Sequence, residues 1–169
     1  MEFSFTNKTV FNSIRYGQID MESVVWKILS YISEDPNANY VIAVGTDSMT
    51  HNHKGTKFAV VITVHREGKG AIFFYKTIKT KPIVSLFEKV DEETKLSVNL
   101  ANYLLKSLGT IVQEETSHVR VVIHMDVGKN GPTSQFVDYL ESYVKGYRYD
   151  FAIKPDSYAA STIADMISK

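Results

Sequence analysis

The chain has 169 residues, which suits a single domain, and its 44% hydrophobic and 22% charged residues exclude a disordered protein. Nineteen acidic residues balance nineteen basic ones, so the total charge carries no signature of nucleic-acid binding, and the lack of cysteine excludes disulfides and thiolate metal sites. No signal peptide is recognisable and no apolar run reaches the roughly 18 residues that cross a bilayer, so we expect a cytoplasmic protein without a membrane partner.

The N-terminal part of the chain, residues 1–39, is expected to hold an arm and one helix. Residues 1–19 show no clear pattern and are expected to form an extended arm that packs on the body. A helix is predicted over residues 20–33, with Asp20 as its cap. Its apolar residues recur at the spacing of one helical face: Met21, Val24, Val25, Ile28, Leu29 and Ile32.

Three strands are predicted next. Residues 40–44 form a continuous apolar run, which is typical of a strand buried on both faces. Residues 49–57 are polar and are expected to form a loop, and further strands are predicted over 58–64 and 71–78. Because short connections join antiparallel neighbours, these strands should form a three-stranded meander.

The second half of the chain alternates helices and strands. A helix is predicted over 84–108, a strand over 118–127, a helix that ends near Gly146, a strand over 151–153 and a helix over 156–168. The whole order indicates an α/β fold with a mixed five-stranded sheet, antiparallel on one side and parallel on the other, flanked by helices.

Two aspartates follow the predicted central strands. Asp47 lies just past the first strand and Asp126 at the end of the fourth. If these strands are parallel neighbours, both carboxylates emerge at the same edge of the sheet, where ligand sites of open α/β sheets lie. The alternative is that each is an ordinary turn or capping residue.

Two further acids fit the same site. Glu93 lies in the buried phase of the 84–108 helix, where a carboxylate is costly unless it is paired or binds a metal; the alternative is a favourable interaction with the helix N-terminus. Glu88 lies off that stripe and is expected to be solvated. Asp156 opens the last predicted helix, where an ordinary N-cap is the alternative.

A group of such carboxylates needs a counter-charge, because like charges raise one another's pKa. Oxygen-only ligands suit Mg²⁺ or Mn²⁺. Two such ions about 3.5–4 Å apart can clamp the attacking and leaving oxygens of a phosphodiester. The acids therefore predict a two-metal site.

The order of elements over residues 40–169, with acids at these four positions, resembles the ribonuclease H-like fold and its four-carboxylate site. The segment 154–164 is similar to the part of ribonuclease HII that carries its last metal ligand. The nearest resemblance is to the YkuK-type family of bacterial ribonuclease H-like proteins. It rests on Val44–Ser48, Leu86–Lys89 with Glu93 and Thr94, His124–Gly128, and Lys154–Ser157.

The resemblance implies one ribonuclease H-like domain over residues 1–169, with its core over 40–169. It implies a nuclease in which Asp47 and Asp126 bridge two metal ions while Glu93 and Asp156 each hold one. Ser48 stands where ribonuclease HII has a glutamate, so Glu93 would take that role as in ribonuclease HI, with Glu88 as the alternative.

Basic residues gather in the meander, where seven lie between positions 48 and 87 against one acidic residue, Glu67. They could follow a phosphate backbone or simply solvate a hairpin. The candidates are Lys54, Lys57, Lys76, Lys79 and Lys81. Near the acids, His124 is either a neighbour of the metal ligands or a structural histidine, and Lys154 either balances the acids or contacts a phosphate.

Two functions follow. The first is a nuclease that hydrolyses nucleic-acid phosphodiesters with Mg²⁺ or Mn²⁺. The alternative is a non-catalytic module of the same fold that binds nucleic acid or a protein, which fits Ser48 in place of an acid and the neutral total charge.

Overall fold

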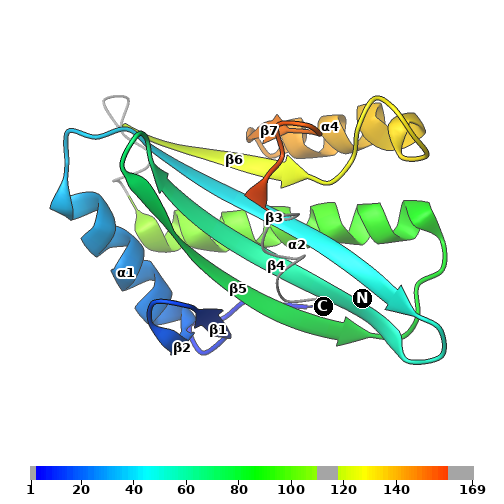
Figure 1. Ribbon diagram of the computed structural model, residues 1–169, viewed down its shortest axis with the longest axis horizontal. Coiled ribbons are helices and arrows are strands. Elements are labelled where there is room, and N and C mark those ends of the chain that lie inside the picture. Colours follow the sequence, from blue (N-terminus) through cyan, green and yellow to red (C-terminus); the bar gives the residue numbers. More distant parts are fainter. Residues whose placement is uncertain (1–2, 110–117, 160–169) are drawn as a thin grey trace.

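The protein is built on one seven-stranded sheet with the strand order β2-β1-β5-β4-β3-β6-β7 (Figure 1). The computed structural model describes residues 3–109 and 118–159. Its strands are β1 (Val10–Ser13), β2 (Gly17–Asp20), β3 (Tyr40–His51), β4 (Gly55–Arg66), β5 (Gly70–Thr80), β6 (Val119–Met125) and β7 (Asp150–Ala152). Its helices are α1 (Met21–Glu34), α2 (Leu86–Leu108), the 3-10 turn η1 (Ser134–Phe136) and α4 (Val137–Gly146).

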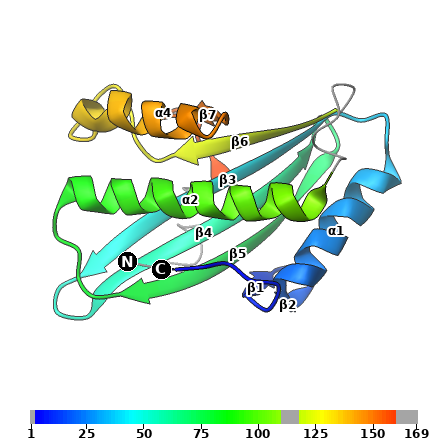
Figure 2. The ribbon, with the colours of Figure 1, turned by 180° about the vertical axis from the view of Figure 1, so that it is seen from behind.

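The five strands from β5 to β7 confirm the predicted mixed sheet. β3, β4 and β5 pair antiparallel, whereas β6 is parallel to β3 and β7 is parallel to β6. Helix α2 runs along one face of this sheet (Figure 2). Ile42 and Val44 of β3 pack into the core on that face together with Leu100 and Leu104 of α2. The α/β class and the helix-covered sheet are therefore as the sequence predicts.

The expected N-terminal arm is instead a β-hairpin, so the predicted count of five strands is wrong. Strands β1 and β2 pair antiparallel, and β1 joins the sheet through a single pair, Asn12 with Tyr75 of β5. Phe11 is fully buried and anchors the hairpin in the core. The hairpin escapes sequence analysis because its two strands have only four residues each, too few to show a clear alternation. The predicted cap is confirmed, since Asp20 Oδ1 accepts a hydrogen bond from the Ser23 amide at 2.8 Å.

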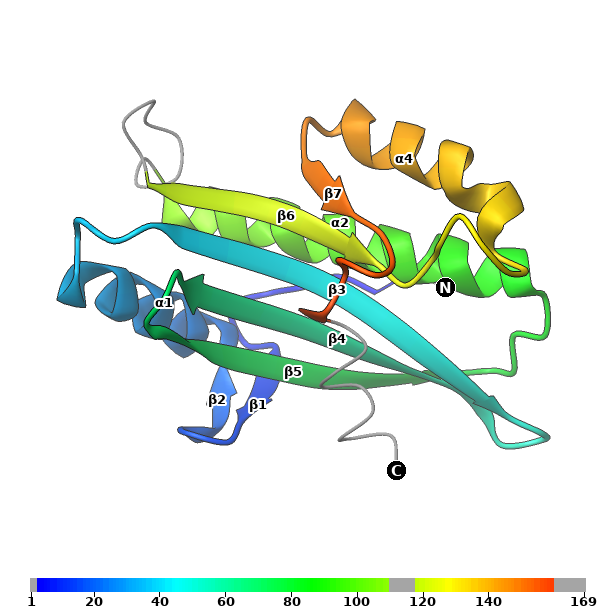
Figure 3. The ribbon, with the colours of Figure 1, turned by 45° about the horizontal axis from the view of Figure 1, so that its top comes forward.

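The predicted loop over residues 49–57 is also wrong. β3 continues to His51 and pairs with β4 as far as Gly55, so that only three residues form the turn. Gly55 has φ +110°, and a Cβ there would collide with the carbonyl oxygen of Thr80. The long ribbon of β3 and β4 extends past the end of β6 (Figure 3). Its polar side chains hide it from hydrophobicity patterns, because this end of the ribbon has no apolar face to bury.

The C-terminal part departs from prediction at one point. Residues 153–158 form a turn, a bend and irregular chain after β7, with a cis peptide bond between Lys154 and Pro155, and helix is assigned only at Ala159. Asp156 therefore does not open a helix. The rest of the predicted helix lies outside the described residues, including Asp165 and the apolar positions Ala160, Ile163, Ala164 and Ile167.

Candidate functional site

The parallel pairing of β3 and β6 brings Asp47 and Asp126 to adjacent positions. The last pair of this ladder is Thr46 with Met125, and the two aspartates are the next residue on each strand. Neighbouring strands lie about 4.8 Å apart, so the two half-buried residues are close neighbours just past the last pair of the ladder. Asp47 lies inside β3 rather than beyond it, because β3 continues in the ribbon with β4.

Glu93 approaches the same place from α2. Its side chain is 7% exposed, which confirms that it lies in the buried phase of the helix, and Ser48 Oγ donates a hydrogen bond to Glu93 Oε1 at 2.5 Å. Burial raises the pKa of Glu93 well above its ordinary value; the Ser48 hydrogen bond opposes this rise, and the charges of Asp47 and Asp126 add to it. Glu88 is exposed, as expected.

The three acids do not all point the same way. Successive residues of a strand face opposite sides of the sheet, so Ser48 faces α2 and Asp47 faces away from it. In residues 3–109 and 118–159, no group of three or more histidine, aspartate or glutamate side chains is close enough to hold one metal ion. The structure thus brings Asp47, Glu93 and Asp126 within electrostatic reach of one another without closing a ligand cage.

Asp126 has a cation beside it. Lys154 Nζ lies 2.9 Å from Asp126 Oδ1. That oxygen is buried, and the ammonium provides a close partner for its negative charge. Pairing with Asp126 raises the pKa of Lys154, and Asp47 and Glu93 contribute to the rise. Lys154 therefore balances the acids, one of the two roles considered for it.

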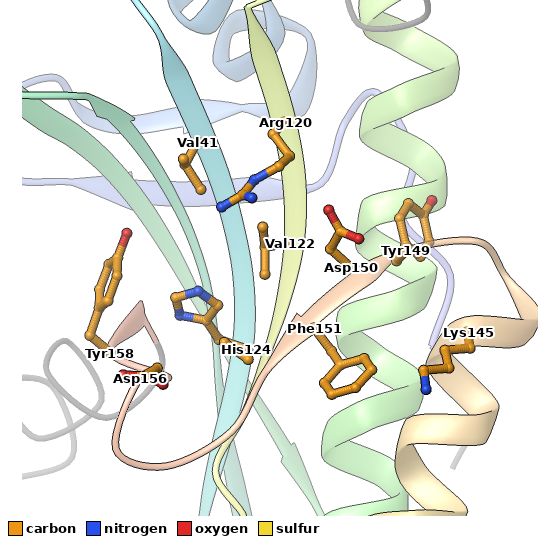
Figure 4. A pocket seen from close by; sticks show the side chains of 11 residues that line it. Val41, Arg120, Val122, His124, Lys145, Tyr149, Asp150, Phe151, Asp156 and Tyr158 are labelled. Carbon is orange, nitrogen blue, oxygen red and sulfur yellow. The ribbon is translucent and has the colours of Figure 1, made fainter.

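Asp156 lies two residues after Lys154, and both residues line a hollow beside Gly128. It is exposed in the bend after Pro155, and its backbone amide donates to the Ile153 carbonyl at 2.8 Å. Its side chain lines the rim of a hollow beside β7 (Figure 4).

His124 is a buried histidine with structural partners. Its Nδ1 accepts a hydrogen bond from the Ala159 amide at 3.1 Å. Its ring packs edge to face with that of Tyr158, with 4.7 Å between the ring centroids. Burial lowers the pKa of His124 to about 4. Together with Tyr158 and Arg120, His124 lines the hollow beside β7, which has a volume of about 620 Å³ (Figure 4). Arg120 and Tyr158 were not predicted to lie there, although Arg120 lies four residues before His124 and therefore shares its face of β6.

The predicted basic stripe is divided between the two faces of the sheet. Lys57 pairs directly with Lys79 across β4 and β5. On β4, Lys57 lies two residues from the partner of Asp47, so its side chain is on the same face of the sheet as Asp47. Lys76 reaches β1 instead, where its Nζ donates to the Val10 carbonyl at 3.3 Å. Lys54 lies in the β3–β4 turn and Lys81 just past β5, and both are exposed.

A buried hydroxyl pair beneath the acids was not predicted. Thr46 Oγ1 and Ser97 Oγ lie 2.8 Å apart, and Ser97 Oγ also donates to the Glu93 carbonyl at 3.0 Å. This contact ties β3 to α2 next to Ser48 and Glu93. The sequence feature that could have predicted this contact is the pair of hydroxyl residues at positions 46 and 48, which share one face of the strand.

The mixed sheet and the helix across it are those of a ribonuclease H-like fold. The sequence model of the family described as "Ribonuclease H-like" matches residues 23–169, and the chain belongs to this family. The chain is 29% identical over 168 residues to "Uncharacterized protein YkuK" of Bacillus subtilis (strain 168), covering 95% of this chain and 97% of that protein. No solved structure matches significantly. In the described residues, no helix is both long and apolar enough to span a membrane.

Proposed function

We propose that the protein is a nuclease that hydrolyses nucleic-acid phosphodiesters with Mg²⁺ or Mn²⁺. The observation that carries this proposal is the adjacency of Asp47 and Asp126 at the end of the β3–β6 ladder, with the buried Glu93 within electrostatic reach. Family membership supports the fold on which such a site is built.

The side chains suit a hard divalent cation. They offer only carboxylate oxygens, which Mg²⁺ and Mn²⁺ prefer. Asp126 Oδ1 is buried and already lies 2.9 Å from a positive charge, the ammonium of Lys154, so this position favours a cation. The pKa of Glu93 is raised mainly by burial, and the charges of Asp47 and Asp126 raise it further, so a cation here would stabilise its carboxylate.

Each acid has a role in this proposal. Asp47 and Asp126 would hold both ions, and Glu93 and Asp156 would each hold one. Bound ions of this kind supply an activated water and neutralise charge on the phosphate. Ser48 fixes the carboxylate of Glu93 through its 2.5 Å hydrogen bond, and the Thr46–Ser97 pair holds the helix against the strand beneath it.

The substrate is proposed to lie along the β3–β4 ribbon. Lys57 and Lys79 share the sheet face of Asp47 and offer two adjacent positive charges near it. Lys54 and Lys81 extend this charge at the end of the ribbon. Replacing both Lys57 and Lys79 with Gln should weaken binding for all sequences and reduce the slope of log K against log salt by up to about 2.

The test is cleavage of a labelled panel with Mg²⁺, Mn²⁺ or EDTA: RNA–DNA hybrid, duplex DNA, single-stranded RNA and DNA, and a branched junction. Metal-dependent cutting that is lost in Asp47→Asn and in Asp126→Asn is expected. Glu67→Gln is the matched control, because Glu67 is an exposed acid in the β4–β5 turn. Cutting that survives both aspartate substitutions would disprove the assignment.

One observation favours the second candidate, a non-catalytic module that binds nucleic acid. Lys154 already provides a positive charge at Asp126, so a folded site without metal is electrostatically reasonable. A module of this kind would bind the same nucleic acids equally well in EDTA and would cut none of them.

A further inference from the structure

Lys154 is held at the acidic site by its own backbone and by the shape of the neighbouring loop. Its amide donates to the Val127 carbonyl at 2.8 Å, directly beside Asp126 in the chain. Its side-chain stem passes over Gly128, where a Cβ would come within 3.3 Å of Lys154 Cβ and 3.9 Å of Cδ. A glycine at position 128 thus leaves space for the lysine stem. The ammonium group then reaches Asp126 Oδ1 at 2.9 Å.

The ammonium can nevertheless leave. The side chain of Lys154 is 54% exposed, whereas that of Asp126 is 20% exposed. Ion pairs with one solvated partner are weak, and the lysine of this pair is more than half exposed. The lysine has four flexible carbons, so its charge can swing into solvent while its backbone stays docked on Val127. The charge of Lys154 also acts on Asp47 and Glu93, so its departure changes the balance of all three acids.

We infer that Lys154 is a tethered counter-ion, which neutralises the acids in the metal-free protein and gives up Asp126 Oδ1 when a divalent cation binds. This inference rests on the proposed metal site. It assigns Lys154 a positioning role that opposes metal binding: the ion must displace a positive charge that the chain itself supplies. Metal-free protein is thereby protected from the repulsion of its own carboxylates.

The experiment measures Mn²⁺ binding directly, by the loss of the free-ion electron paramagnetic resonance signal on titration, and the melting temperature in EDTA. Lys154→Gln removes the tethered charge, and Gly128→Ala pushes the stem aside while the lysine is retained. Lys129→Gln is the matched control, because Lys129 is an exposed lysine directly after Gly128. Wild type and Asp126→Asn complete the set.

Lys154→Gln should bind Mn²⁺ about two- to five-fold more tightly than wild type, the range expected for losing one weak ion pair. It should also melt at a lower temperature in EDTA. Gly128→Ala should shift the Mn²⁺ affinity in the same direction by less, and Lys129→Gln should change neither quantity. Equal or weaker Mn²⁺ binding by Lys154→Gln, with binding by wild type intact, would overturn the inference and leave the proposed function standing.

The remaining outcomes separate the two proposals. If wild type does not bind Mn²⁺ but Lys154→Gln does, Lys154 is a permanent counter-ion and the metal-dependent nuclease is wrong. If neither protein binds Mn²⁺, both the displacement and the metal site are refuted. If Mn²⁺ binds wild type and Asp126→Asn equally, the ion does not use Asp126 and the inference fails.

Discussion

Replacing Glu93 with glutamine should stabilise the metal-free protein at neutral and alkaline pH. Glutamine keeps the shape of the side chain and an oxygen that can accept the Ser48 hydrogen bond, but it removes a charge that is 7% exposed and lies near Asp47 and Asp126. Burial of an ion that lacks its own counter-ion costs several kcal/mol, of which the Ser48 hydrogen bond and the Lys89 charge offset part. We therefore expect a gain of about 1–3 kcal/mol for Glu93→Gln, since the carboxylate keeps part of its compensation.

The gain should depend on pH in a defined direction. The pKa of Glu93 is higher in the folded protein than in the unfolded chain, so below the ordinary value of 4.5 the group is protonated in both states and its ionisation costs nothing. As the pH rises above 4.5, Glu93 loses its proton readily in the unfolded chain but keeps it in the folded protein. Wild type therefore loses stability relative to Glu93→Gln. The loss levels off once the pH has passed the folded pKa.

Thermal denaturation in EDTA at pH 4 and pH 8 measures this difference. A gain of 1 kcal/mol corresponds to about 2–4 °C in Tm for a chain of this size. Glu88→Gln is the matched control, because Glu88 lies on the same helix but is exposed. The reasoning is refuted if Glu93→Gln is no more stable than wild type at pH 8, or if its advantage is the same at pH 4. Addition of Mn²⁺ should reverse the order, since the ion would stabilise the carboxylate and not the amide.

Three further predictions follow from individual contacts. Gly55→Ala should destabilise the protein by more than about 1 kcal/mol in urea denaturation, because a Cβ at φ +110° collides with the Thr80 carbonyl; an unchanged midpoint would contradict the tight hairpin. The His124 imidazole should remain neutral down to about pH 4 in an NMR titration, whereas a midpoint near 6.5 would mean that it is solvated. Leu100→Ala should cost about 2–5 kcal/mol of unfolding free energy, because Leu100 is fully buried between α2 and the sheet; a loss under 1 kcal/mol would place it outside the core.

Periodicity alone was enough to predict the core elements and the burial of Glu93. The apolar stripe of α2 placed Glu93 in its buried phase, because a helix brings residues three, four and seven apart onto one face. The central run of β3 and the strand that ends at Asp126 were equally clear. The sequence therefore predicted that Asp47 and Asp126 would meet if their strands were parallel neighbours, and the parallel β3–β6 ladder supplies that condition.

The tertiary structure determined the features that no sequence periodicity predicts. The position of the β1–β2 hairpin depends on the burial of Phe11 in the core. The end of the β3–β4 ribbon depends on backbone pairing, which its polar side chains do not indicate. The direction of Asp47, away from the face of Ser48 and Glu93, depends on the strand continuing through it. The contact of Lys154 with Asp126 depends on a loop docking on Val127 and on space above Gly128. Sequence patterns indicate which side chains prefer burial. The distances between loops are determined only in the folded protein, because the packed core determines where each strand ends.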